Sequence, residues 1–290
     1  MRVELAGSLV HPDPLVIRFD ASGNFHTPDY IDLGYTHFDV ICIGGGGGMG
    51  GGIDTVNTGT QIRSYGGAGG GGGYHRIRGL LSALPADCPV VVGAGGTLGT
   101  EHASNPALTT DGGDGGVSTF NATTCRASGG KGGKRVQSNS TTVTTQANGG
   151  DGGVGDRTAA GGGATGGVAG TPTATGPGTP GTAGQDGTFF SDVGKGGGGG
   201  AGGVGKYGGT TLNAATAGGR GSYNPGDTSV YGPGGQPSTG PATSAANIRP
   251  GSASGAKAAP VTGLPTVYGQ SKGTRVVSDP GVVVIRLTAE

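Results

Sequence analysis

Blocks of the form Gly-Gly-X-Gly-Gly dominate the middle of this chain and limit what it can fold into. Three of them occupy residues 112–116, 129–133 and 149–153, with Asp, Lys and Asp at the central position. Between Thr109 and Asn247 there is one Leu, and there is no Ile or Met. This stretch therefore cannot supply the apolar stripe of an amphipathic helix or the alternating pattern of a half-buried strand. Related glycine blocks occur at 66–73, 161–167, 196–205 and 232–235.

The spacing of the blocks has a period of three, which is also the period of a polyproline-II helix. Such a helix has no internal hydrogen bonds, so its N–H and C=O groups must pair with neighbouring segments. Two of its three faces would carry only glycine, which allows neighbours to approach backbone to backbone. We therefore predict a lattice of parallel and antiparallel polyglycine-II helices. The alternative is that the blocks are flexible linkers, and their regular spacing favours the lattice.

The two ends of the chain read as strands. Apolar runs predict strands at 38–43, 74–78, 88–92 and 281–287, and the pattern of 15–27 predicts a hairpin with its turn at 20–24. The only helical candidate, 79–84, is too short for a stable helix. The predicted fold class is mostly β, with an irregular polyglycine-II helix sandwich and little or no α-helix. We divide the chain into an N-terminal strand or attachment segment, 1–24, and a glycine-rich domain, 25–290.

Composition excludes several classes of function. The chain has 73 Gly and 17 Pro among 290 residues, and only 32% of its residues are hydrophobic, against roughly 45–50% in an average domain. Its 18 basic and 18 acidic residues cancel, so it lacks the positive excess of a nucleic-acid-binding protein. No apolar run is long enough to span a membrane or to form a signal peptide, which predicts synthesis in a cytoplasm.

The common sequence motifs of catalytic, metal and nucleotide sites are absent from the sequence. Cys42, Cys88 and Cys125 are odd in number and have no CxxC spacing, which favours buried free thiols over disulfides or a zinc site. None of the Gly-Lys pairs continues into the Ser or Thr of a phosphate-binding loop. A GxGxxG match at 45–50 is followed by residues that cannot start the required helix. The expected protein is therefore not an enzyme and has no cofactor, no metal ion and no catalytic residues.

The order of features resembles a known family of domains. The strand Phe-Asp-Val-Ile-Cys-Ile at 38–43 runs into Gly44–Gly48, Val-Val-Val at 90–92 runs into Gly-Ala-Gly-Gly, and Val-Val-Val-Ile-Arg-Leu at 282–287 closes the chain. With the glycine blocks between them, these features resemble the glycine-rich domain of bacteriophage minor tail proteins and tail-tip adhesins, especially those of phages that infect actinobacteria. The resemblance covers roughly residues 25–290.

This resemblance implies a structural tail protein that presents loops for recognition of the host cell surface. Its implied location is the tail tip or fibre of the virion, after synthesis in the host cytoplasm. The implied partners are other tail proteins, through the N-terminal segment, and a glycan or protein of the host envelope, with no nucleic acid and no membrane span. The analogy with phage fibres also implies a homo-oligomer, a trimer.

Loops between glycine segments are the expected recognition surfaces, because binding residues tend to lie on loops held by rigid scaffolds. Four candidate loops occupy 138–147, 171–190, 207–231 and 236–266. The aromatic and arginine side chains that could stack on sugars are the candidate receptor contacts: Tyr207, Arg220, Tyr223, Tyr231, Arg249 and Tyr268.

Two other readings stay open at this point. The central region also resembles a glycine-helix antifreeze, in which a flat face bearing Thr or Ala orders water, although the X positions here are mixed Asp, Lys and Val. Glycine-repeat surface proteins of mycobacteria share the GGxGG runs, but they carry a helical N-terminal export module, and residues 1–43 read as strands.

Overall fold

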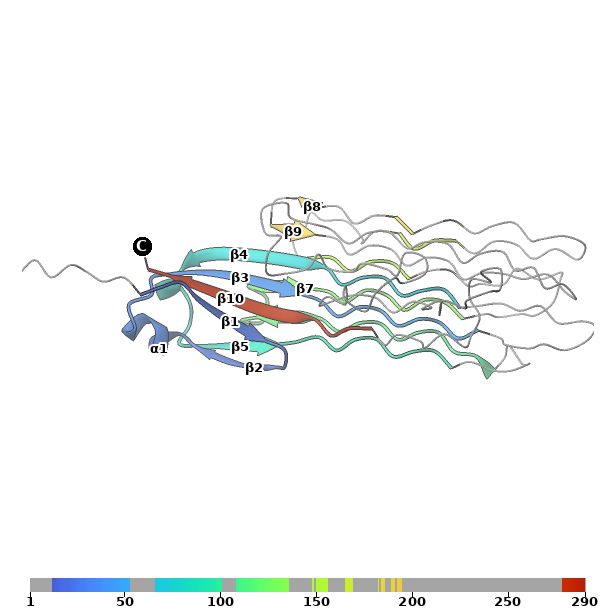
Figure 1. Cartoon of the computed structure of the whole chain (residues 1–290), viewed down its shortest axis with the longest axis horizontal. Helices are drawn as coiled ribbons and strands as arrows, with labels where there is room; N and C mark the ends of the chain where they lie inside the picture. Colours follow the sequence, from blue (N-terminus) through green and yellow to red (C-terminus); the bar gives the residue numbers. More distant parts are fainter. Residues whose placement is uncertain are drawn as a thin grey trace, which may run out of the picture.

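The computed structural model describes residues 12–52, 66–100, 108–135, 148, 150–155, 165–168, 182, 184–185, 189–190, 192–194 and 278–289. In this part of the chain, strands gather at one end of an elongated molecule, and glycine segments continue from them towards the other end (Figure 1). The strands form two antiparallel sheets with the orders β1-β10-β3-β4-β9-β8 and β2-β5-β6-β7. No helix in the described ranges is long and apolar enough to cross a membrane.

The six-stranded sheet contains β1 (Leu15–Phe19), β3 (His37–Ile43), β4 (Tyr74–Leu80), β8 (Phe189–Phe190), β9 (Val193–Gly194) and β10 (Val282–Thr288). The four-stranded sheet contains β2 (Gly23–His26), β5 (Asp87–Val91), β6 (Ser118–Phe120) and β7 (Cys125–Ala127). The helical residues described are α1 (Thr27–Asp32) and the short 3-10 helix η1 (Leu81–Ala83). The prediction of a mostly β fold with little α-helix is confirmed.

The strands predicted at 38–43, 74–78, 88–92 and 281–287 are present as β3, β4, β5 and β10, within two residues at each end. The predicted N-terminal hairpin is wrong. β1 pairs with β10 and β2 pairs with β5, so the turn between them carries the chain from one sheet to the other. The physical reason is that β10, a run of Val and Ile, offers β1 a longer apolar partner than the four-residue β2 does. β1 lies within the predicted attachment segment 1–24, whose role and boundary stay a prediction.

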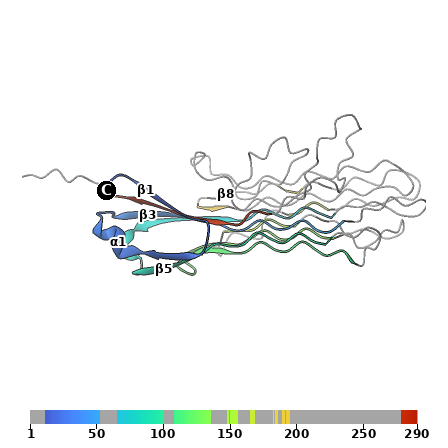
Figure 2. The ribbon, with the colours of Figure 1, turned by 60° about the horizontal axis from the view of Figure 1, so that its bottom comes forward.

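The main hydrophobic core lies between the two sheets. Phe25 of β2 and Phe120 of β6 are fully buried and meet edge to face with ring centroids 5.9 Å apart, and Tyr30 of α1 stacks on Phe25 at 4.7 Å. Cys42, Cys88 and Cys125 are buried free thiols, as predicted. A second cluster of buried side chains, which includes Ile41, Ile43 and Val284, occupies the other face of the six-stranded sheet. Figure 2 shows the sandwich narrowing towards the glycine segments.

Paired glycine segments continue the register of the paired strands that they adjoin. Ile43 pairs with Tyr74 at the end of the β3–β4 ladder. Beyond that point the amides of Gly44, Gly47 and Gly50 donate to the carbonyls of Gly73, Gly70 and Gly67 at 3.0, 2.8 and 2.9 Å. The same two antiparallel chains therefore stay paired, but the bonds recur at every third residue instead of every second. The same continuation joins β5–β6 to the pair 93–100 and 109–117.

The two sheets merge where the core side chains end. Segment 44–52 follows β3 of one sheet, and segment 109–117 precedes β6 of the other. Sheets that pack through side chains lie about 10 Å apart, but these two segments hydrogen-bond directly. The amides of Gly45, Gly48 and Gly51 donate to the carbonyls of Gly116, Gly113 and Thr110 at 2.9, 2.8 and 2.9 Å. Segment 44–52 thus lies at the centre of a bundle, bonded to 66–73, 93–100, 109–117, 128–135 and 278–281.

Contacts around segment 44–52 also repeat every third residue. A Cβ atom on Gly44 or Gly47 would collide with the backbone of segment 128–135, and one on Gly45 or Gly48 would collide with segment 93–100. The third face carries Met49, which is buried. This is the period that the lattice prediction requires; the polyglycine-II dihedral angles themselves stay a prediction.

Candidate functional site

The end of the glycine lattice farthest from the sheets is where the chain makes three of its connections. Segments 44–52, 93–100 and 128–135 each run outward from a strand, and the chain returns along 66–73, 108–117 and 148–155. Hydrogen bonds between segments show that their outer ends lie side by side. The amide of Gly50 donates to the carbonyl of Gly67, and the amide of Gly51 donates to that of Thr110. The connections 53–65, 101–107 and 136–147 therefore all start and finish at this end. At the opposite end of the molecule, Leu15 at the start of β1 pairs with Leu287 near the end of β10.

Polar contacts hold the described residues at this far end. The amide of Thr100 donates to the hydroxyl of Thr110 at 2.7 Å, and the guanidinium of Arg135 donates to the carbonyl of Thr109 at 2.7 Å. Leu108 is exposed. These two bonds tie Thr100 and Arg135 to the segment 108–117 at the far end of the lattice.

One face of the lattice carries a ladder of ion pairs. Lys131 donates to Asp114 at 2.8 Å, and Lys134 donates to Asp111 at 3.0 Å. The second carboxylate oxygen of each Asp accepts a backbone amide of the neighbouring segment, that of Gly132 or Arg135, at 2.9 Å. These carboxylates therefore satisfy amides that face outward from the lattice as well as pairing with lysines.

The pKa values on this face reflect that pairing. Burial acts to raise the pKa of Asp114, but the hydrogen bonds from Lys131 and the Gly132 amide outweigh it and leave the pKa below its ordinary value. The hydrogen bond with Asp114 raises the pKa of Lys131. No group of three or more His, Cys, Asp or Glu side chains in the described ranges is arranged to hold a metal ion.

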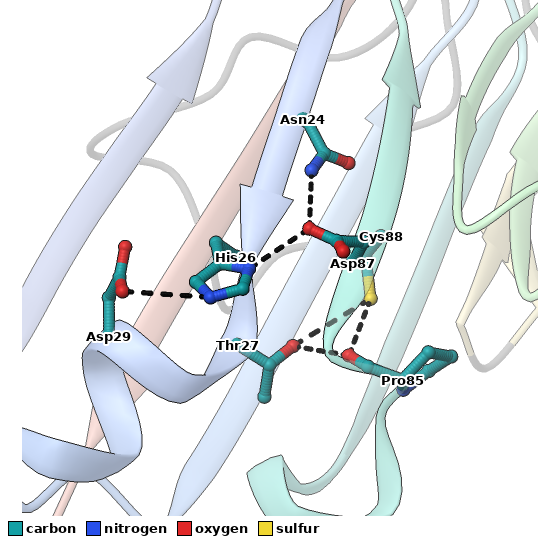
Figure 3. A network of polar contacts seen from close by, with 7 residues as sticks. All are labelled: Asn24, His26, Thr27, Asp29, Pro85, Asp87 and Cys88. Carbon is teal, nitrogen blue, oxygen red and sulfur yellow. Dashed lines mark hydrogen bonds and ion pairs between the residues drawn. The ribbon is translucent and has the colours of Figure 1, made fainter.

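A second polar cluster joins β2, α1 and β5 at the other end of the molecule (Figure 3). Nδ1 of His26 lies 2.9 Å from Asp87, whose same carboxylate oxygen accepts a bond from Asn24 at 2.8 Å. Nε2 of His26 lies 3.8 Å from Asp29. The hydrogen bond with Asp87 raises the pKa of His26, and in turn the bond with His26 lowers the pKa of Asp87.

The chemistry of this cluster is that of a structural clasp. A nucleophilic triad needs a hydroxyl or thiol hydrogen-bonded to the histidine. The nearby Thr27 hydroxyl instead donates to the carbonyl of Pro85 at 2.7 Å, and the Cys88 thiol points to the same carbonyl at 3.5 Å. Both ring nitrogens of His26 face carboxylates, so the histidine serves to tie three elements together.

Asp279 leads to a prediction about pH. Its carbonyl accepts the amide of Gly46 at 3.0 Å, and burial raises the pKa of its half-buried side chain to about 6. The unfolded state releases this proton near the ordinary value of 3.8, so the folded state loses stability as pH rises from about 4 to above 6. Asp279→Asn, which cannot ionise, should raise the melting temperature at pH 8 and leave it unchanged at pH 4.

Asp114→Asn is the matched control for this measurement, because its pKa shift has the opposite sign. The lowered pKa of Asp114 contributes stability that is present above the ordinary value and lost at lower pH. This variant should therefore melt at a lower temperature than wild type at pH 8, and the difference should shrink towards pH 3. An Asp279→Asn difference that does not change with pH would contradict the assignment.

The candidate receptor contacts predicted from the sequence lie outside the described residues. They are Tyr207, Arg220, Tyr223, Tyr231, Arg249 and Tyr268, and they stay predictions. The candidate loops 138–147, 207–231 and 236–266 also lie outside, as does most of 171–190.

The pairing of charges in the ion-pair ladder was not predicted, although Asp114 and Lys131 were noted at the centres of two glycine blocks. The turn at Asn121–Thr124 could have revealed it. When the β6–β7 hairpin register is extended away from this turn, Asp114 lies opposite Lys131 and Asp111 lies opposite Lys134.

Comparison with known families gives one match. A family described as a glycine-rich domain matches residues 21–288, which is nearly the whole chain. A search of curated proteins found no match.

Proposed function

The chain belongs to the glycine-rich domain family, and from this premise we propose that it is a structural minor tail protein of a bacteriophage that presents loops for host recognition. The observation that carries the proposal is the difference between the two ends of the molecule. The glycine segments that flank 53–65, 101–107 and 136–147 all end at the far end of the lattice, whereas Leu15 of β1 and Leu287 of β10 pair at the near end.

A rigid lattice suits this role for a physical reason. Backbone hydrogen bonds hold the segments together, so the sequences of the connecting loops can change without disturbing a side-chain core. In the proposal, the near end faces the rest of the virion and the far end faces the host. The proposed partners are neighbouring tail proteins, through residues 1–24, and a host-envelope glycan or protein. A trimer at the tail tip or fibre, made in the host cytoplasm, completes the proposal.

The two alternatives receive less support. An ice-binding face needs regular rows of Thr or Ala, but the ladder face carries Asp111, Asp114, Lys131 and Lys134. A glycine-repeat surface protein would have an extended helical N-terminus. Residues 12–43 instead contain β1, β2, β3 and the six-residue helix α1.

The test is binding of labelled, purified full-length protein to intact actinobacterial cells, with excess unlabelled protein as competitor. We expect saturable binding that the competitor removes. A variant in which 138–147 is replaced by a Gly-Ser linker of equal length should bind more weakly. The control changes Thr123 and Thr124 to Ser in the β6–β7 turn at the near end, and it should bind like wild type.

Both variants must melt like wild type before binding is compared. Absence of competed binding by folded protein would overturn the recognition role and leave a tail scaffold or connector. Equal loss of binding in both variants would show that the far end is not the binding surface. If the far-end variant alone binds weakly, substitution of Tyr207, Tyr223 and Tyr231 is the next step.

A further inference from the structure

Two of the three buried cysteines meet across the sandwich. Cys42 lies on β3 of the six-stranded sheet, and Cys125 lies on β7 of the four-stranded sheet. The Cys42 thiol donates to the carbonyl of Cys125 itself at 3.6 Å. The Cys125 thiol reaches back to β3 and β4, towards the carbonyls of Val40 at 4.0 Å and His75 at 3.3 Å. The two side chains are therefore neighbours in the core.

The third cysteine occupies a separate site. The Cys88 thiol contacts the carbonyl of Pro85 at 3.5 Å and the hydroxyl of Thr27 at 3.8 Å, near the clasp of Figure 3. These contacts tie Cys88 to the connection that precedes β5 and to the start of α1. Geometry thus divides the thiols into one cross-sheet pair and one single residue.

We propose that Cys42 and Cys125 form a disulfide between the two sheets when the protein folds in an oxidising medium. A disulfide requires Cα atoms about 4.4–6.8 Å apart and Cβ atoms about 3.5–4.5 Å apart. The geometric support for the proposal is that the Cys42 sulfur lies 3.6 Å from the main-chain carbonyl of Cys125.

The oxidant is a low-molecular-weight disulfide, R–S–S–R. One cysteine thiolate attacks it, which forms a mixed disulfide and releases one R–SH. The second thiolate then attacks the cysteine sulfur of the mixed disulfide, which forms the Cys42–Cys125 bond and releases the second R–SH. Two thiols are oxidised, one disulfide is reduced, and the two protons leave on the released thiols.

The disulfide can form while the protein folds, but not after it has folded. Both thiols have no exposed surface in the folded state. Burial and the neighbouring Cys42 thiol raise the pKa of Cys125, so the reactive thiolate is scarce there. The oxidant can reach these residues only while the sheets are apart. Reduced protein should therefore stay reduced once it has folded.

The position of the pair gives the bond a structural consequence. Cys42 lies two residues before Gly44, and Cys125 lies three residues before Ser128, where the glycine segments start. The bond would clamp the two sheets just before they merge into the lattice. It would also close a loop that contains three strands and four glycine segments, and long closed loops restrict the unfolded chain most.

The experiment refolds the full-length protein with and without oxidised glutathione and counts free thiols after denaturation. Without oxidant we expect three thiols. With oxidant we expect one thiol, a mass loss of two hydrogen atoms, and a higher melting temperature. Peptide mapping should then show Cys42 joined to Cys125. Reduced, folded protein exposed to the same oxidant should keep all three thiols.

Three variants make the result specific. Cys88→Ser should still form the bond and finish with no free thiol, whereas Cys42→Ser and Cys125→Ser should form no intramolecular bond. Cys88→Ser removes a residue outside the pair, so it tests the pairing even where the other variants fold poorly. Three thiols after oxidative refolding, a mixed disulfide with glutathione as the end product, or a bond that involves Cys88 would each overturn the proposal.

Discussion

Gly48→Ala should destabilise the protein by about 3 kcal/mol or more, which is at or above the upper end of the usual cost of overpacking. The new Cβ would lie on top of the carbonyl group of Thr97, which is backbone and cannot rotate away. Gly48 is also bonded on both sides: its amide donates to Gly113 at 2.8 Å, and its carbonyl accepts from Gly133 at 2.8 Å. Relief of the clash therefore requires whole segments to separate.

Urea unfolding measures this prediction, with Gly23→Ala as the matched control. A Cβ on Gly23 would approach only the ring of Phe19, at 3.4 Å, which is ordinary van der Waals contact with a side chain. Gly23 lies in β2, where alanine has the lower entropic cost of ordering, so its change in stability should stay within about 0.5 kcal/mol. Similar unfolding midpoints for the two variants would show that the lattice does not depend on close backbone contact.

The strands and the glycine lattice differ in how far the sequence predicts them. An apolar run such as 38–43 indicates a buried strand by itself, and a three-residue glycine period indicates backbone-to-backbone packing. Neither pattern indicates which strand or glycine segment pairs with which other one. The pairing of β1 with β10 was therefore missed, because it joins the two ends of the chain. The helix α1 was missed as well, although Pro28 at its start is a signal of a helix N-terminus.

Candidate site residues are harder to predict for a related reason. In the segments 109–117 and 128–135, the side chains at the third position, such as Asp114 and Lys131, are exposed. They therefore carry no pattern of burial that would distinguish a binding contact from ordinary solvent exposure. Asp114 and Lys131 became recognisable as a pair only through the register of the hairpin that joins them. Tyr207 and the other proposed contacts lie outside the described residues, and the chemistry of their side chains alone selected them.

The continuous register indicates that strand pairing in the β-sandwich determines the register in which the glycine segments pair. Glycine segments of repeating sequence could pair in several registers with similar backbone bonds. In the structure each pair keeps the register of its strands: β6–β7 joins Ser118 to Ala127, and the same two chains then join Gly115 to Gly130. The side-chain core would therefore select one register, and the lattice would extend it outward.

Phe120→Ala tests this dependence and should cost about 3–5 kcal/mol, the usual loss for removing a buried phenylalanine ring. Phe120 has no exposed surface and packs against Phe25 in the main core, and it lies only three residues after segment 109–117. Phe120→Leu is the control, since it keeps most of the apolar volume and should cost less than about 1.5 kcal/mol.

Hydrogen exchange of single amides separates two outcomes of this substitution. If the sandwich sets the register, the amides of Gly48 and Gly113, which lie deep in the lattice, should lose protection by the same free energy as the amides of β3 and β6. If the lattice folds as a unit of its own, strand amides in Phe120→Ala should exchange faster while those two glycine amides keep their wild-type protection. That second result would contradict the dependence of lattice on sandwich, because bonds such as that from Gly48 to Gly113 would then hold without the core beside them.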